Sequence, residues 1–176
     1  MQKLTIQLIT IPSVILFLLL VSCDKENIEQ RTFETEQAEL DNKLKQLENQ
    51  KFNIDTITNG LYYIIRKPGE GANLQEGDEC TISYRAFLLN GTKIEDSYEI
   101  FPSGGKWTFK YKPEHAVEGL LTGLAFMNKG ADYEFYIASD FAYGSEGANN
   151  VPPFSTIIYQ VKMEEIKYDV EEQASS

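Results

Sequence analysis

Apolar residues recur at every second position in five short segments of the chain, and this spacing constrains the fold more than any other feature. The segments read LYYIIRK, TISYRAFL, KWTFKYK, DYEFYIA and TIIYQVKM. Successive side chains of a β-strand point to opposite faces of a sheet, so the pattern predicts strands with one apolar and one solvated face. Turn signals such as Asn59-Gly60 and Asn90-Gly91 separate the runs, which is typical of an antiparallel sheet.

One segment among these strands has helical spacing instead. It ends at Gly130, a residue type that commonly terminates helices. Its apolar positions are Val117, Leu120, Leu121, Leu124 and Met127. The expected fold class is therefore α+β, with a twisted antiparallel β-sheet wrapped around one short α-helix.

Composition indicates one globular domain without a nucleic-acid partner. The chain has 176 residues, of which 42% are hydrophobic and 12% aromatic, enough for one core of ordinary size. It carries 27 acidic and 16 basic residues, for a net charge of −11. Because binding to nucleic-acid phosphates needs clustered Lys and Arg, we expect no such partner.

The first 22 residues resemble a bacterial lipoprotein signal peptide. Lys3 precedes a long apolar stretch that ends in Leu20-Val21-Ser22-Cys23. In such signals the cysteine becomes the lipidated first residue, so the resemblance implies that Cys23 anchors the protein in a lipid bilayer. The expected location is the bacterial cell envelope, facing the periplasm or the exterior. The alternative is an uncleaved membrane helix, which Pro12 disfavours.

Residues 23–56 are expected to form a helical stalk or linker. From residue 24 to residue 55 the chain is polar and has no Gly or Pro, and Leu40, Leu44 and Leu47 recur at helical spacing. We expect these leucines to pack on the domain. A dimerising coiled coil is the alternative, but it needs a stripe of three or four heptads. The domain itself would span residues 57–168, followed by a disordered tail over residues 169–176.

Cysteine and histidine are scarce. With Cys23 acylated only Cys80 remains, which excludes an intrachain disulfide, and His115 is the sole histidine. A Cys-His nucleophile pair and a zinc site are therefore not expected. The sequence indicates no metal and no cofactor.

Several motifs together resemble the FKBP-type peptidyl-prolyl cis-trans isomerases. They occur in that family's order and nearly at its spacing over about residues 60–166: LYYIIRKPGEG, GDECTISY, NGT, AVEGLLTGLAFMNKG, DFAYGSEG, VPP and YQVKMEEI. The resemblance implies an FKBP-like fold, rotamase activity and proline-containing polypeptides as substrates. The signal, stalk and acidic character also look like FKBP-type lipoproteins associated with gliding motility, which would add cell-envelope machinery as a partner.

Isomerisation of an X-Pro bond requires neither a nucleophile nor a metal. Rotation breaks amide resonance, against a barrier of roughly 18–20 kcal/mol, and the planar amide is more polar than the twisted one. A dry aromatic pocket therefore favours the twisted transition state over the ground state. A hydroxyl donor can also hold the substrate carbonyl while the bond turns.

The resemblance assigns roles to individual residues. It implies Tyr143, Tyr84 and Tyr159 as catalytic residues, with the Tyr143 hydroxyl donating to the substrate carbonyl and residues 145–151 forming one wall. The residues that it implies for substrate binding are Ile94, Glu95, Trp107, Phe109, Val117, Leu120 and Val151. Without a motif, aromatic residues at alternating spacing are more often core packing than a site, whereas the motif around Tyr143 favours function.

Three residues depart from the family's pattern. The family usually has Phe-Asp where this chain has Ile94-Glu95, with Asp96 one residue later, and a tryptophan floor where this chain has Leu120. A branched aliphatic floor keeps a pocket dry but lacks the flat surface on which a proline ring rests. Three hypotheses stay open: an anchored isomerase that assists folding of exported proteins, a catalytically weak FKBP-like binding module or chaperone, and a motility-machinery subunit.

Overall fold

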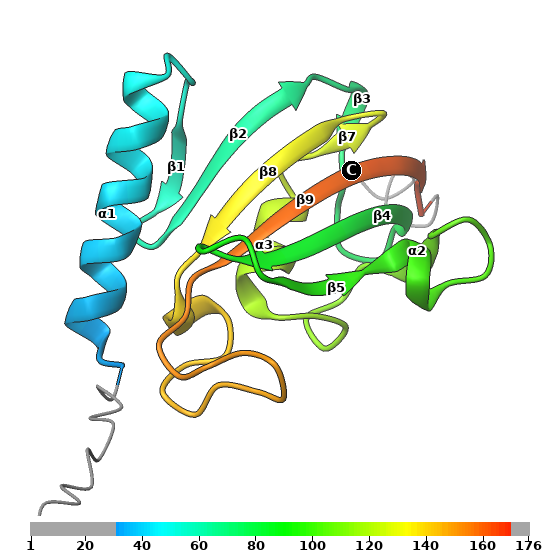
Figure 1. Cartoon of the computed structure of the whole chain (residues 1–176). Coiled ribbons are helices and arrows are strands. Elements are labelled where there is room, and N and C mark those ends of the chain that lie inside the picture. Colours follow the sequence, from blue (N-terminus) through cyan, green and yellow to red (C-terminus); the bar gives the residue numbers. More distant parts are fainter. Residues whose placement is uncertain (1–30, 170–176) are drawn as a thin grey trace, which may run out of the picture. The chain divides into compact units, whose positions relative to one another are not determined.

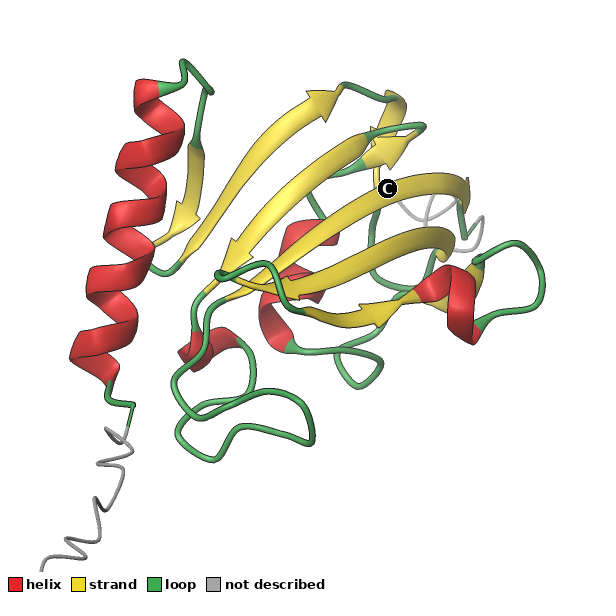
Figure 2. Cartoon of the chain, in the orientation of Figure 1, coloured by secondary structure: helices red, strands yellow, loops and turns green. Residues whose placement is uncertain are grey.

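The alternating segments form strands of one antiparallel sheet. The computed structural model describes residues 31–169, so the expected signal segment, Cys23 and residues 170–176 of the expected tail lie outside the described residues. Figure 1 gives the arrangement of the elements and Figure 2 their secondary structure. The elements are α1 (Phe33–Asn49), β1 (Asp55–Thr58), β2 (Leu61–Lys67), β3 (Glu70–Asn73), β4 (Glu79–Leu88), β5 (Lys93–Asp96), α2 (Ser97–Ile100), β6 (Trp107–Lys110), α3 (Glu118–Leu124), β7 (Asn128–Lys129), β8 (Asp132–Ile137), the 3-10 helix η1 (Ser139–Phe141) and β9 (Ile157–Lys167).

The larger sheet has seven strands in the order β1-β2-β8-β9-β4-β5, with β6 also paired to β4. The two long strands β4 and β9 pair antiparallel along almost their whole length. On its other edge β4 pairs with β6 through residues 79–82 and with β5 through residues 85–87. A second, two-stranded sheet joins β3 to β7. The expected α+β, FKBP-like architecture is confirmed.

The inner face of the sheet, which we define by Tyr84, Phe135 and Tyr159, packs against α3. All three side chains belong to one buried cluster with the apolar residues of that helix. Gly119 and Gly123 let the helix approach closely, because a Cβ on Gly123 would lie 2.7 Å from the Phe135 ring and one on Gly119 would lie 2.3 Å from an Ile137 methyl. The helix that the sequence predicts in this segment is present.

The helix α3 is shorter than its apolar spacing suggests. It ends at Leu124, after which the amides of Phe126 and Met127 donate to the carbonyls of Gly123 and Leu124. These bonds span three residues rather than four and tighten the last turn, as is common at helix ends. Met127 is still fully buried, so the helical spacing reports burial beyond the helix itself.

The opposite, outer face of the sheet is covered by α1, which Figure 1 shows beside β1 and β2. Leu40 and Leu47 form a second buried cluster with Ile64, Tyr136 and Ile158. The expectation of one solvated face on each strand is therefore wrong where α1 lies on β2, β8 and β9, because the leucine stripe of the helix replaces solvent there. The expected packing of the leucines is confirmed, and the domain boundary at residue 57 stays a prediction.

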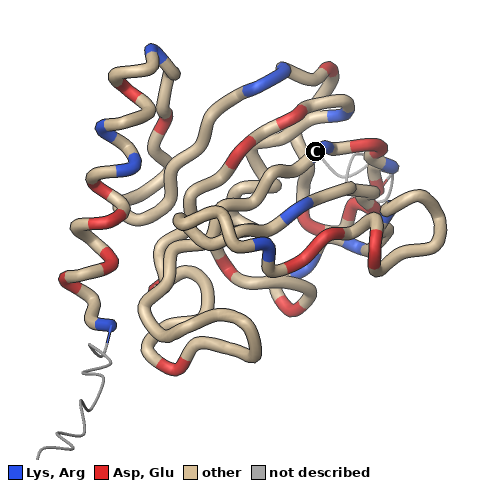
Figure 3. Tube along the Cα trace, in the orientation of Figure 1, with Lys and Arg blue, Asp and Glu red and all other residues tan. Residues whose placement is uncertain are grey.

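The charged residues of the described chain are dispersed. Figure 3 shows Lys and Arg spread over the helix and the strands, with Asp and Glu interspersed among them. In residues 31–169 no helix is both long enough and apolar enough to cross a membrane.

Candidate active site

A hollow of about 330 Å³ lies between the inner face of the sheet and the start of α3. It is lined from β4 and β9, from β6, from the turn before α3 and from the loop that follows η1. We define the pocket loop as residues 139–156, from η1 to the start of β9. The lining residues are Tyr84, Glu95, Phe101, Trp107, His115, Ala116, Val117, Leu120, Tyr143 and Tyr159.

Tyr84 is held in place from two directions. Its hydroxyl donates to Glu95 Oε2 at 3.1 Å, and its backbone amide donates to the buried Ser97 Oγ at 2.9 Å. Burial, followed by the negative charge of Glu95, raises the pKa of Tyr84 above its ordinary value. The phenol therefore stays protonated at neutral pH and keeps donating to the carboxylate.

Aromatic rings make the walls. The Tyr84 ring lies 6.0 Å from both the Trp107 and the Tyr159 ring centroids. Trp107 is stacked on Phe109 at 4.1 Å and on Phe101 at 6.2 Å. Stacked and tilted contacts are common geometries of aromatic pairs, so the rings of the walls pack on one another.

Tyr143 enters the hollow from the pocket loop. The Ser139 carbonyl accepts from the amides of Ala142 and Gly144 at 2.9 Å each, and these two residues flank Tyr143. Burial, followed by the neighbouring Tyr143, raises the pKa of Tyr159 above its ordinary value. The buried Tyr159 phenol and the half-buried Tyr143 phenol thus meet at the hollow.

These residues lie in a segment with a clear family assignment. Residues 70–164 match the family described as FKBP-type peptidyl-prolyl cis-trans isomerase. The chain belongs to the FKBP-type peptidyl-prolyl cis-trans isomerase family.

Relatives among known proteins agree with this membership. Peptidyl-prolyl cis-trans isomerase Mip of Coxiella burnetii is 33% identical over 115 residues, which are 65% of this chain and 48% of that protein. FkpA of Escherichia coli, named an FKBP-type peptidyl-prolyl cis-trans isomerase, is 27% identical over 114 residues, 65% of this chain and 40% of that protein. The chain therefore aligns with about half of the length of these relatives or less.

Solved structures share the fold. The crystal structure of E. coli FkpA superposes with a TM-score of 0.65 at 24% identity, covering 76% of this chain and 60% of that one. The N-terminal domain of FKBP42 from Arabidopsis thaliana gives 0.60 at 25% identity, covering 66% of this chain and 93% of that domain.

The structure brings together seven of the residues expected from the FKBP resemblance. They are Tyr84, Glu95, Trp107, Val117, Leu120, Tyr143 and Tyr159. The side chain of Leu120 is almost fully buried in the inner core, and the backbone of Val117 caps the start of α3. The floor of this FKBP pocket is thus aliphatic.

Three expected residues do not line the hollow. Phe109 is buried behind Trp107 and supports it. Val151 is buried within the pocket loop and lines a separate depression with Pro152 and Pro153. Ile94 lies where the pairing of β4 with β5 shifts register, and packs against the inner core.

The sequence patterns do not predict three of the residues that line the hollow, which are Phe101, His115 and Ala116. All lie in turns, where alternation gives no signal. The His115 ring lies 5.5 Å from the Phe109 ring, and His115 lines the hollow. Phe101 follows the short helix α2 and stacks on Trp107.

Neither a thiol nucleophile nor a metal is suggested by the described residues. Cys80 is fully buried, and burial raises the pKa of its thiol to about 12, so it is un-ionised at neutral pH and a poor nucleophile. Within residues 31–169 no group of three or more His, Cys, Asp or Glu side chains is arranged to hold a metal ion.

Proposed function

We propose that this chain catalyses the cis-trans isomerisation of X-Pro peptide bonds in the aromatic hollow. The observation that carries the proposal is the meeting of Tyr84, Tyr143 and Tyr159 around one hollow. Family membership supports the same activity. The substrate class would be proline-containing segments of unfolded or extended polypeptides.

In this mechanism the pocket binds the twisted amide more tightly than the planar one. A proline ring enters between Tyr84, Trp107 and Tyr159 and rests on Leu120. Because the planar amide is the more polar form, a site with few water molecules disfavours it relative to the twisted transition state. The Tyr143 hydroxyl donates to the substrate carbonyl, and Glu95 fixes the orientation of the Tyr84 ring through its hydroxyl.

We further propose that the protein works at the cell envelope as a lipoprotein. Support comes from the sequence alone, since Leu20-Val21-Ser22-Cys23 resembles a lipidation signal. Acylated Cys23 would hold the domain at a bilayer, where exported chains are its substrates. Radiolabelled palmitate should enter the wild-type chain and not Cys23→Ser, and absence of label from wild type would disprove the anchor.

A catalytically weak binding module is the second candidate, because of one observation. Leu120 supplies less flat surface to a proline ring than the tryptophan usual in this family. Such a module would grip proline-containing segments as a chaperone without turning them over. A subunit role in gliding-motility machinery rests on overall resemblance to lipoproteins of that kind.

A protease-coupled assay with X-Pro peptides, run on residues 24–176, separates the candidates. An isomerase accelerates the slow phase in proportion to protein concentration. A binding module leaves that phase unchanged but binds the same peptides by titration calorimetry. A protein that neither accelerates the phase nor binds the peptides is incompatible with both.

A further inference from the structure

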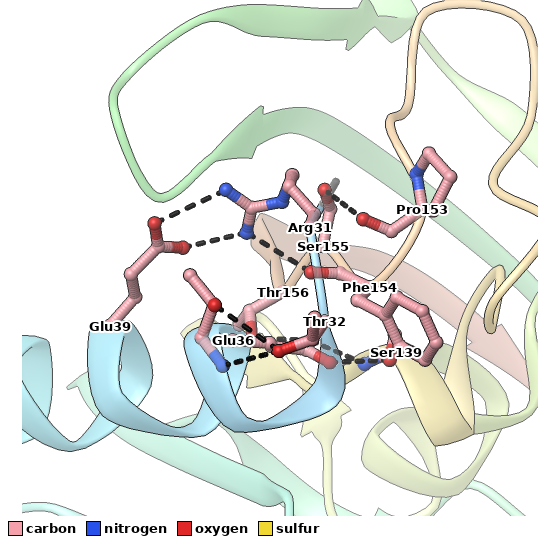
Figure 4. Close-up of polar contacts among 10 residues, drawn as sticks. Arg31, Thr32, Glu36, Glu39, Ser139, Pro153, Phe154, Ser155 and Thr156 are labelled. Carbon is pink, nitrogen blue, oxygen red and sulfur yellow. Dashed lines mark hydrogen bonds and ion pairs between the residues drawn. The ribbon is translucent and has the colours of Figure 1, made fainter. Parts of the chain in front are cut away.

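Glu36 is a fully buried acidic residue on α1, and its partners all lie on the pocket loop. Oε1 accepts from the Ser139 amide at 2.7 Å and from Thr156 Oγ1 at 2.8 Å, and Oε2 accepts from Ser139 Oγ. Figure 4 shows this set of contacts. The sequence separations are 103 and 120 residues, so the contacts join parts of the chain that only the fold brings together.

The partners are the first and the last residue of the pocket loop. Ser139 begins η1 and Thr156 directly precedes β9. One carboxylate therefore holds both ends of the segment that carries Tyr143. A loop whose ends are fixed has fewer conformations to lose when it binds a substrate.

The bonds continue from Ser139 to the backbone around Tyr143. Glu36 holds the amide and hydroxyl of Ser139, and the carbonyl of Ser139 accepts from Ala142 and Gly144. Two successive hydrogen bonds thus connect the carboxylate on α1 to the backbone amides of the two residues that flank Tyr143.

Arg31, just before α1, makes a second link to the same loop. Its Nη2 donates to the Phe154 carbonyl at 3.0 Å while the guanidinium also pairs with Glu39. The Phe154 amide in turn donates to the Gly144 carbonyl at 3.0 Å. Phe154 has a φ of 48°, a left-handed conformation that a non-glycine residue adopts only when its surroundings hold it there.

The arrangement is costly to break. A buried carboxylate is tolerated only when hydrogen-bonded, and the loop supplies the donors. Glu36 lies in the first turns of α1, where the helix dipole favours negative charge. Moving α1 away would leave the Ser139 amide and the Thr156 hydroxyl without the acceptor they use in this structure.

We propose that Glu36 is a positioning residue of the active site, which acts by holding the pocket loop and with it Tyr143. The inference rests on the proposed isomerase function, and it makes α1 part of the catalytic apparatus. It differs from a purely structural role because its effect is local to the pocket loop.

The test compares Glu36→Ala with wild type by hydrogen exchange and by kinetics. We expect the Ala142 and Gly144 amides to exchange about tenfold faster or more, the factor that corresponds to losing one hydrogen bond to a charged group. kcat/KM on an X-Pro peptide should fall about as much, mainly through KM, because a loop that must be ordered on binding weakens ground state and transition state alike. Glu36→Gln keeps one acceptor oxygen and should be intermediate.

Leu47→Ala is the matched control. Leu47 is buried on the same helix about 16 Å farther along, given a rise of 1.5 Å per residue, and it belongs to the outer cluster rather than to the loop contacts. Leu47→Ala should lower the melting temperature. At a temperature at which every variant is folded, it should leave hydrogen exchange of the pocket-loop amides and KM unchanged. If Glu36→Ala fails to fold, Thr156→Val removes one donor from the loop side and should give the same effects in smaller measure.

The outcomes separate this proposal from the isomerase assignment. Faster loop exchange in Glu36→Ala supports the positioning role even if wild type has no turnover, in which case only the isomerase assignment fails. If wild type is active while loop exchange and KM in Glu36→Ala match those of Leu47→Ala, the positioning role is refuted. Effects of Glu36→Ala and Tyr143→Phe on kcat/KM that simply add would also refute it, because residues acting through one element are not additive.

Discussion

The helix α1 should contribute to the stability of the domain, and Leu40→Ala measures by how much. The Leu40 side chain is 1% exposed and packs in the outer cluster with Tyr136, which is equally buried. Truncating a buried leucine to alanine costs about 2–5 kcal/mol. Because α1 lies at the surface and the site can partly collapse, we expect about 2–3 kcal/mol.

The expected shift in melting temperature follows from the size of the domain. For a domain of this size, a loss of 1 kcal/mol in the free energy of unfolding lowers the melting temperature by about 4 °C. Leu40→Ala should therefore unfold about 8–12 °C below wild type. Thermal unfolding followed by circular dichroism on residues 24–176 makes the measurement, with the exposed Lys45→Ala on the same helix as control.

A shift of less than about 2 °C for Leu40→Ala, equal to that of Lys45→Ala, would refute the reasoning. The helix would then be a stalk that contributes nothing to the domain, as an isolated spacer does. A complete loss of the cooperative unfolding transition in Leu40→Ala would mean that the domain cannot fold without the packing of α1, which is a larger contribution than the burial of two leucines implies. Between these limits the shift measures how much the outer cluster stabilises the sheet.

Three further results are expected. Tyr143→Phe removes a neutral hydrogen bond of about 0.5–1.5 kcal/mol, so kcat/KM should fall roughly two- to tenfold without a change in melting temperature. Tyr159→Ala opens the wall of the pocket and should lower kcat/KM further. A larger loss of kcat/KM in Tyr143→Phe than in Tyr159→Ala would contradict the mechanism. Leu120→Trp should raise kcat/KM if the aliphatic floor limits turnover, and a well-folded variant with an unchanged or lower rate ends that idea. Burial alone would raise the pKa of Glu134, but hydrogen bonds from Tyr136, Arg66 and Gln160 lower it. Its stabilising effect is therefore present above its unfolded pKa of about 4.5 and is lost as the pH falls below that value, so Glu134→Gln should flatten the loss of melting temperature in acid, and an unchanged acid limb would contradict this.

The sheet could be predicted from the sequence because its inner face is a strict two-residue pattern. Tyr133, Phe135 and Ile137 alternate along β8 and all lie in the inner cluster. The same pattern did not predict that residues of the outer face are also buried. Ile64, Tyr136 and Ile158 sit at positions that an antiparallel sheet usually exposes, and only the leucine stripe of α1 indicated that something would cover them.

The contacts of Glu36 could not be read from the sequence. An acidic residue in the first turns of a helix is common and usually solvated, because it interacts with the helix dipole there. Its burial depends on the angle at which α1 crosses the sheet and on where Ser139 and Thr156 end up. No local pattern encodes partners more than 100 residues away.

The pairing of β4 with β5 decides which residue of the acidic pair Glu95-Asp96 faces the pocket. In the register of β4 with β5, Glu95 is opposite Ala86 and Asp96 is opposite Arg85. Neighbouring residues of a strand point to opposite faces, so only one acid of the pair can face the pocket. Glu95 accepts from Tyr84, whereas Asp96 pairs with Arg85 at 3.2 Å and accepts the Tyr98 amide at the start of α2.

The longer side chain of Glu95 therefore still supplies the carboxylate that fixes the Tyr84 ring. Ile94 occupies the extra position where the register shifts between Ala86 and Phe87, so it packs on the core rather than lining the hollow. Of the departures from the family's pattern, Glu95 and Leu120 line the hollow, and Leu120 is the one at its floor. The floor is therefore the departure that we expect to lower turnover, and the kcat/KM of Leu120→Trp compared with that of wild type measures how much activity it costs.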